Sequence, residues 1–143
     1  MKKIILLLIT IVSLSSCSSN DDDTTSLNAI IGNWQLKSMT ENDEERTTDC
    51  TRKSTVTFLE NGNGSQISYN ENYDGNGNAI CENDDNGTFT WENSTGSIYK
   101  IIEEGDISEV QITFSQDKST FSIEFSETFN DVVYSLITTY KKI

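Results

Sequence analysis

Short alternating segments fill most of the chain between Trp34 and Tyr140, and they constrain its fold more than any other feature. In each segment apolar and polar side chains alternate with a period of two, and clusters of Asn, Gly, Asp or Ser separate one segment from the next. A β-strand has this period because successive side chains point to opposite faces of the sheet. The chain shows no long helical period between the segments. The sequence therefore predicts an all-β fold.

We expect eight strands, joined mostly by short turns. They cover residues 34–38, 54–59, 65–70, 87–92, 97–102, 107–114, 121–125 and 132–140. Trp34, Leu36 and Ser38 are expected on one face of the first strand, and a polar loop from Glu71 to Asn86 follows the third. Short connections make neighbouring strands antiparallel. Such strands can hide one apolar face in a sandwich or a barrel, and the sequential hairpins favour an eight-stranded antiparallel up-and-down β-barrel.

The N-terminus is typical of a secretory signal peptide. Met1-Lys2-Lys3 is positively charged, and the apolar run 4–12 is too short to span a bilayer as a helix, which needs about 20 residues. Leu14-Ser15-Ser16-Cys17 resembles the bacterial lipobox, in which the cysteine is diacylated and becomes the first residue. The resemblance implies a signal peptide over residues 1–16 and a lipid anchor at Cys17, which several acyl chains make durable.

A polar, acidic segment follows the expected anchor. Cys17-Ser18-Ser19-Asn20-Asp21-Asp22-Asp23 resembles the acidic export signal of surface lipoproteins in one Gram-negative phylum. The resemblance implies an outer-membrane protein displayed at the cell surface. The alternative is a solvated spacer on a protein that faces the periplasm. In both cases we expect residues 17–26 to be a flexible tether and residues 27–143 to form one folded domain.

Two cysteines remain once Cys17 is acylated. In an oxidising compartment the even pair Cys50 and Cys81 is expected to form a disulfide, and the alternatives are two free thiols or a nucleophilic cysteine. The chain has no histidine that could lower the pKa of a catalytic thiol. We place Cys50 just before the second strand and Cys81 in the polar loop. Their Cα atoms should then lie within about 7 Å of each other.

Charge and motifs argue against several classes of function. The formal charge of −13 leaves no basic stripe for nucleic acid. Alternating oxygen side chains over residues 74–78 are similar to a calcium loop, but Ala79 and Asp85 replace the glycine and the bidentate glutamate that an EF-hand needs. Without histidine the chain lacks the commonest metal ligand and the usual general base. We therefore expect no metal, no cofactor and no enzymatic activity.

The start of the folded domain carries a family signature. A short helical entry, Leu27 to Ile31, precedes Gly32 and Trp34, which stand as in the Gly-x-Trp motif of lipocalins. With the lipobox, the dipeptide Asp49-Cys50 and the tail Tyr140-Lys141-Lys142, residues 27–143 resemble the bacterial lipocalin-like lipoproteins. The resemblance implies that Trp34 packs across the closed end of the barrel, beside Lys141 or Lys142. Trp34 is then a marker of the fold and does not bind a ligand.

Aromatic side chains leave two functions open. We expect seven of them to line the barrel: Phe58, Tyr69, Phe89, Trp91, Phe114, Phe121 and Phe125. They could enclose a pocket for a small hydrophobic ligand, or they could fill the barrel and leave its loops or acidic outer face to bind a protein or a glycan. An apolar cavity of about 300 Å³ or more would favour the first. We expect a monomer in either case.

Overall fold

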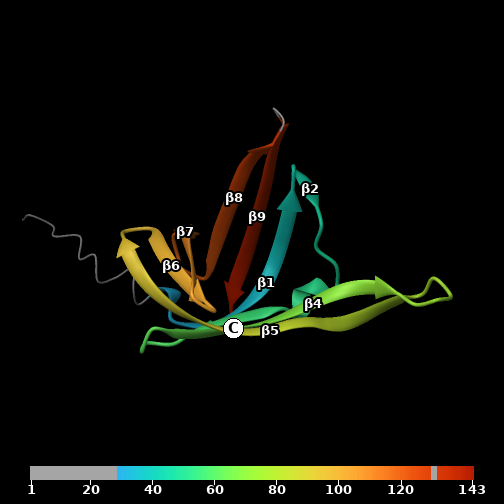
Figure 1. The fold of residues 1–143 in the computed structure, drawn as a ribbon, viewed down its shortest axis with the longest axis horizontal. Coiled ribbons are helices and arrows are strands. Elements are labelled where there is room, and N and C mark those ends of the chain that lie inside the picture. Colours follow the sequence, from blue (N-terminus) through green and yellow to red (C-terminus); the bar gives the residue numbers. More distant parts are fainter. Residues whose placement is uncertain (1–28, 130–131) are drawn as a thin grey trace, which may run out of the picture.

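Antiparallel strands close into a barrel in the computed structural model, which describes residues 29–129 and 132–143 (Figure 1). The expected signal peptide over residues 1–16, the lipidation site Cys17 and the tether over residues 17–26 lie outside the described residues. Among the residues that are described, no helix is long and apolar enough to cross a membrane.

Each barrel strand pairs with the next one along the chain, and the last pairs with the first. The barrel strands are β1 (Gly32–Glu41), β3 (Thr55–Phe58), β4 (Asn63–Tyr73), β5 (Ala79–Thr95), β6 (Ile98–Glu103), β7 (Asp106–Phe114), β8 (Thr120–Phe129) and β9 (Val132–Lys142). A two-residue strand, β2 (Glu44–Glu45), pairs with the end of β1, and a short 3₁₀ helix, η1 (Thr51–Lys53), precedes β3. The predicted eight-stranded up-and-down barrel is confirmed.

The predicted polar loop from Glu71 to Asn86 is wrong. Strands β4 and β5 continue through it as a paired hairpin, whose turn is the segment 74–78 (Figure 1). An Asp74 carboxylate oxygen accepts hydrogen bonds from the backbone N–H groups of Asn76 and Asn78, each at 2.8 Å. These bonds, with one from the Asn78 side chain, lower the pKa of Asp74. Ladder hydrogen bonds need no apolar side chains, so a polar sequence can still form strands.

Strand β1 contains a bulge that changes its inner face. Leu36 lies opposite Tyr140, but Ser38 lies opposite Thr139, and the register shifts between them. The extra residue, Lys37, reverses the alternation of side chains beyond it. Ser38 therefore does not share the face of Trp34 and Leu36, as the sequence predicted, and Met39 takes the inner position.

Aromatic side chains pack the core in edge-to-face pairs. The ring of Phe121 lies 4.8 Å from that of Trp34, and the ring of Phe58 lies 5.4 Å from that of Phe89. Such geometry adds about 0.5–1.5 kcal/mol per pair to the burial of apolar area. The indole N–H of Trp34 donates a hydrogen bond of 2.7 Å to the carbonyl oxygen of Ile30. This bond holds the segment before β1 against the closed end of the barrel.

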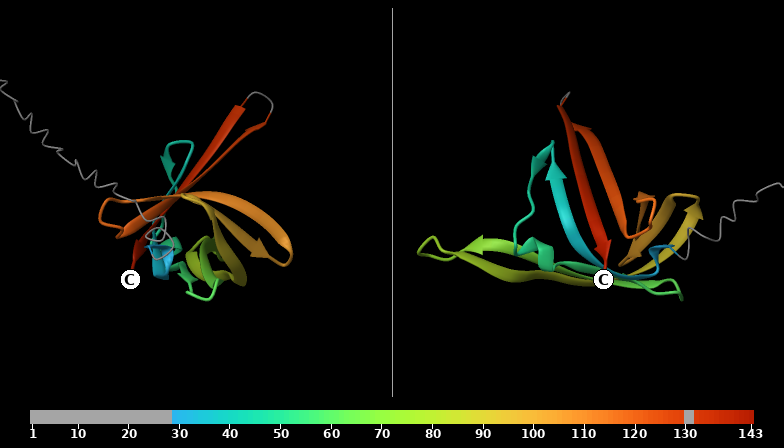
Figure 2. Two further views of the ribbon diagram at one scale, coloured as in Figure 1. Left: turned by 90° about the vertical axis from the view of Figure 1, so that its left-hand side faces the viewer. Right: turned by 180° about the vertical axis from the view of Figure 1, so that it is seen from behind.

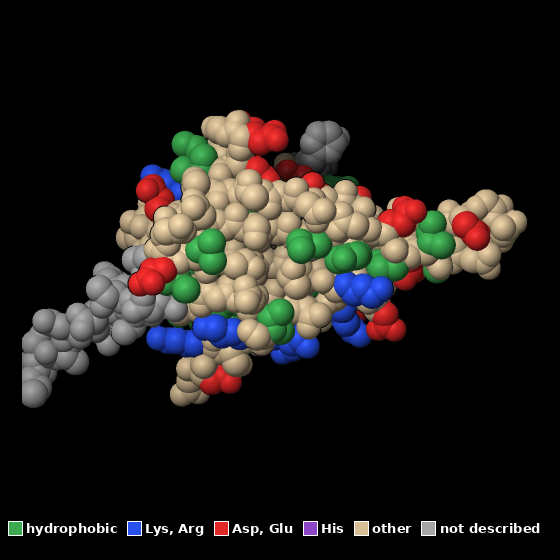
Figure 3. Space-filling model, turned by 90° about the horizontal axis from the view of Figure 1, so that it is seen from below, with side chains coloured by type: hydrophobic (Ala, Val, Ile, Leu, Met, Phe, Trp, Pro, Cys, Tyr) green, Lys and Arg blue, Asp and Glu red, His purple; other side chains and the backbone are tan. Residues whose placement is uncertain are grey.

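The up-and-down order gives the barrel two different rims. The connections after β1, β4, β6 and β8 lie at one end, which we call the open rim, and the turns at 59–62, 96–97 and 115–119 lie at the closed rim. The β4–β5 and β8–β9 hairpins project from the barrel in different directions (Figure 2). Seen from below, Lys and Arg side chains gather along one edge of the molecule, while Asp and Glu side chains occur on the projecting β4–β5 hairpin (Figure 3).

Candidate functional site

At the closed rim, Gly32 and Trp34 both lie against the side chain of Lys142. Gly32 has a φ of 135°, and a Cβ atom there would lie 3.0 Å from Cε of Lys142. Lys142 lies opposite Trp34 in the sheet, and its Nζ is 5.2 Å from the centre of the indole ring, a cation–π contact. Lys141 lies opposite Gln35 on the other face. Lys142 is therefore the basic residue beside the fully buried Trp34.

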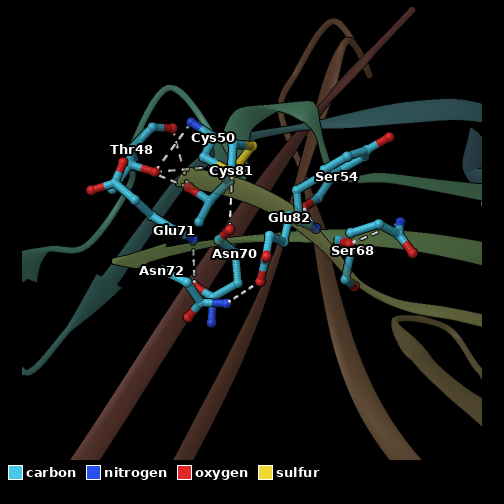
Figure 4. Close-up of a disulfide and its surroundings, with 12 residues drawn as sticks. Thr48, Cys50, Ser54, Ser68, Asn70, Glu71, Asn72, Cys81 and Glu82 are labelled. Carbon is cyan, nitrogen blue, oxygen red and sulfur yellow. Dashed lines mark hydrogen bonds between the residues drawn. A yellow bond between two sulfur atoms is a disulfide. The ribbon is translucent and has the colours of Figure 1, made fainter. Parts of the chain in front are cut away.

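Cys50 and Cys81 form a disulfide with a Cα separation of 5.3 Å (Figure 4). Cys50 is buried at the start of η1, and its sulfur lies 3.1 Å from the carbonyl oxygen of Asn70. Cys81 does not lie in a loop, as we expected, but in β5 opposite Glu71. The bond thus joins η1 to the projecting β4–β5 hairpin.

A cavity of about 120 Å³ lies inside the barrel, above the packed aromatic side chains. It is smaller than the roughly 300 Å³ that is typical of small-molecule pockets. Its wall is mostly apolar and is formed by Val56, Phe58, Phe89, Ile101, Val110, Ile112, Phe121 and Ile123. The barrel is therefore largely filled, with a limited apolar space left in its interior.

Three polar side chains complete the wall of this cavity: Gln66, Glu103 and Tyr140. A Cβ on Gly87 would lie 2.6 Å from Oε1 of Glu103 and 3.2 Å from Nε2 of Gln66, so both groups occupy the space over this glycine. Within the described part of the chain, none of the three side chains has a hydrogen-bond partner, and their polar atoms keep some contact with solvent. Burial raises the pKa of the Tyr140 phenol, which keeps it in its neutral form.

A larger cleft of about 540 Å³ adjoins the cavity at the open rim. Ile101 and Glu103 line both spaces. The remaining wall of the cleft consists of Asp85, Asn86, Gly87, Thr88, Glu104, Asp106 and Ser108. Four carboxylates thus surround the cleft, and neither Lys nor Arg is found among the described residues that line it.

Five of the seven aromatic side chains predicted to line the barrel lie in or against its core. Phe58, Phe89 and Phe121 line the cavity, and Trp91 is buried beside them. Phe114 is partly buried and packs against Trp34 at a ring distance of 6.3 Å. These residues form the floor and part of the wall of the candidate site.

The predicted positions of Tyr69 and Phe125 are wrong. On β4 the inner positions belong to Gly64 and Gln66, which lie opposite the buried Phe58 and Val56. Because side chains alternate along a strand, Tyr69 faces outward. Phe125 continues the inner face of β8 but is 55% exposed. The β8–β9 pairing extends beyond the last β7–β8 pair, so no strand covers it there.

Sequence reasoning missed the polar groups of the cavity. Glu103 continues the inner face of β6 after Ile101, which was a usable signal, but the sequence predicted that this strand ends at Ile102. Gln66 occupies an inner position on β4, whereas the sequence placed Tyr69 of the same strand inside the barrel. Tyr140 lies opposite Phe121, a pairing that only the register reveals.

A family model agrees with the architecture. Residues 30–123 match the family model described as "Lipocalin-like domain". No curated protein matches the chain.

Similar solved structures include the possum milk whey lipocalin trichosurin with bound 4-ethylphenol, at 14% identity and a TM-score of 0.41, over 77% of this chain and 73% of that one. They also include Ex-FABP, a siderocalin described as having dual ligand specificities, at 14% identity and a TM-score of 0.40, over 80% of this chain and 71% of that one.

Proposed function

This chain belongs to the lipocalin-like domain family, and on that premise we propose that it is an outer-membrane-anchored lipoprotein whose barrel binds a small hydrophobic ligand. The observation that carries the proposal is the interior cavity, which combines an apolar wall with three polar side chains that have no hydrogen-bond partner among the described residues. A site for a small molecule typically has this composition, because the apolar wall supplies affinity and a few polar groups fix the orientation.

The volume of the cavity limits the part of the ligand that is buried. A cavity of about 150 Å³ holds one benzene molecule, and the space here is about 120 Å³. It suits a short alkyl group rather than a long lipid chain. The rest of the ligand would occupy the adjoining cleft of about 540 Å³ at the open rim.

Native mass spectrometry tests ligand binding directly. The full-length protein, purified from its own cells in a mild neutral detergent, should show a mass excess that disappears after denaturation. Chemical analysis of the released fraction then identifies the molecule. A mass equal to that of the acylated chain, together with no change in melting temperature on adding small apolar probes, would contradict the proposal.

The lipid anchor is supported by the lipobox at Cys17, and a single substitution tests it. Cys17→Ala removes the thiol that is acylated, so the protein should leave the membrane fraction of cells. Cys50→Ala combined with Cys81→Ala is the control, since it also removes thiols but should leave the protein at the membrane. Retention of the Cys17→Ala protein in that fraction would overturn the anchor.

Surface display is supported by the three aspartates that follow the anchor. A protease added to intact cells should digest the protein, as it should after detergent lysis. Replacing Asp21, Asp22 and Asp23 by Asn should leave the protein in the outer membrane but protect it from the external protease. Full protection of the unchanged protein would favour a periplasmic orientation.

A second candidate function is favoured by the tip of the β8–β9 hairpin. Phe125, Val132 and Tyr134 share one face of this hairpin, and each is between 43% and 55% exposed. Contiguous exposed apolar side chains commonly mark a protein-binding surface. In this alternative the barrel is a scaffold that binds a protein or glycan. Its sign would be a retained macromolecule, lost in Val132→Glu, in place of a retained small molecule.

A further inference from the structure

We infer that the ligand of the barrel is a small primary amine, whose short apolar tail enters the interior cavity while its ammonium group lies beside Glu103. This inference deepens the proposed function and rests on it. Three features carry it: the shape of the space, the unpaired polar groups and the sign of the charge around them.

The shape of the space divides a ligand into two parts. The inner cavity of about 120 Å³ has eight apolar residues in its wall, while the cleft of about 540 Å³ is lined mainly by polar residues. Glu103 and Ile101 stand at the junction because they line both. A molecule that occupies both spaces therefore needs an apolar end and a polar group next to Glu103.

The polar groups of the inner cavity are available for binding. The carboxylate of Glu103, the amide of Gln66 and the phenol of Tyr140 border the cavity, and no described residue donates to or accepts from their side chains. A partly buried carboxylate gains most from a charged donor, because charge-assisted hydrogen bonds are about twice as strong as neutral ones. An ammonium group has three donors, enough to reach Glu103 and a second acceptor.

The charge of the site excludes an anionic head group. Asp85, Glu104 and Asp106 surround the cleft with Glu103, and none of its described lining residues is basic. Lys100 lies on the outer face of β6, where its Nζ is 3.4 Å from a carboxylate oxygen of Glu92. Among the described residues that line the cleft, a fatty acid or another carboxylate would therefore meet only like charge, whereas a cation would be attracted.

Three probes with one tail test the inference. Pentylammonium, 1-pentanol and pentanoate differ in head-group charge and have similar alkyl tails. Each is titrated calorimetrically at neutral pH and constant ionic strength into the full-length lipoprotein in neutral detergent, with detergent alone as the blank. We expect pentylammonium to bind on the order of tenfold more tightly than 1-pentanol, the gain of one charge-assisted contact. Pentanoate should bind most weakly.

A matched pair of variants assigns the preference to Glu103. Glu103→Gln should remove the advantage of pentylammonium and leave the affinity for 1-pentanol nearly unchanged. Glu109→Gln is the control: it removes an exposed carboxylate from the neighbouring strand β7, opposite Lys100.

Equal binding of the amine and the alcohol, or an unchanged ratio in Glu103→Gln, would overturn the inference and leave the proposed function standing. Binding of none of the three probes would count against both. The comparison in the unchanged protein stands by itself if Glu103→Gln does not fold.

Discussion

Gly64 is the glycine with the least space for a side chain. It is buried on the inner face of β4, opposite Phe89, and a Cβ atom at this position would overlap the Phe89 ring. Phe89 in turn packs on Phe58 and lines the cavity. The absence of a side chain at Gly64 therefore creates the space in which the aromatic cluster is ordered.

Gly64→Ala should destabilise the fold by about 1–3 kcal/mol, the usual cost of overpacking a core. The Phe89 ring has to move, and the shape of the cavity should change with it. Gly75→Ala is the matched control, because a Cβ there meets nothing within 4 Å. Urea unfolding followed by tryptophan fluorescence measures both. Equal stability of the two variants would show that the Phe89 ring is not held over Gly64.

At the level of elements, the disulfide decides how the long β4–β5 hairpin is held. Beyond the part that pairs with β3, the described strands of the hairpin pair only with each other, from Ser68 opposite Asp85 to Tyr73 opposite Ala79. A two-stranded hairpin alone is marginally stable in water. The Cys50–Cys81 bond connects it to η1, whose Thr51 is buried against the barrel. The disulfide therefore stabilises the paired strands of the hairpin, and not an irregular loop.

Replacing both Cys50 and Cys81 by Ser should lower the free energy of unfolding by roughly 3–4 kcal/mol, from the loop entropy of a cross-link that spans 31 positions. Amide hydrogen exchange should accelerate in 69–83, while the paired residues of β1 and β9 stay protected. The β8–β9 hairpin is the internal control because it has no cross-link. A uniform acceleration over the whole barrel would contradict a local bracing role.

Sequence alternation predicts the elements where one face is buried and fails where neither is. Ile112 and Phe121 lie in strands that alternate clearly, and both were expected strands. The outer half of β4–β5 has polar residues on both faces, so its strands depend on backbone pairing that leaves no pattern. For the candidate site, the aromatic floor was predictable from the sequence. The inward positions of Gln66 and Glu103 were not, because they follow from the strand register. A polar residue inside a barrel looks the same in sequence as one outside.

At the scale of the whole molecule, stability depends on closure between the two ends of the chain. β9 pairs with β8 on one side and with β1 on the other, and the backbone N–H of Ile143 donates to the carbonyl oxygen of Asn33 at 3.0 Å. The end of the chain therefore lies beside its entry into the barrel. Removing β9 would expose two strand edges at once, and unpaired edges invite aggregation.

A circular permutant tests whether closure, rather than the order of the strands, stabilises the barrel. A short Gly-Ser linker joins Ile143 to Ala29, the new ends lie in the turn at 75–76, and residues 1–28 are kept before the new N-terminus. Every strand pair and the disulfide are preserved, so the permutant should fold with a stability within about 1–2 kcal/mol of the parent, since the linker changes only a short loop closure. Deletion of residues 132–143 is the contrasting variant and should abolish cooperative unfolding. Near-ultraviolet circular dichroism and urea unfolding measure both chains. If the permutant fails to fold while the deletion variant retains a cooperative transition, closure between β1 and β9 does not hold the molecule together.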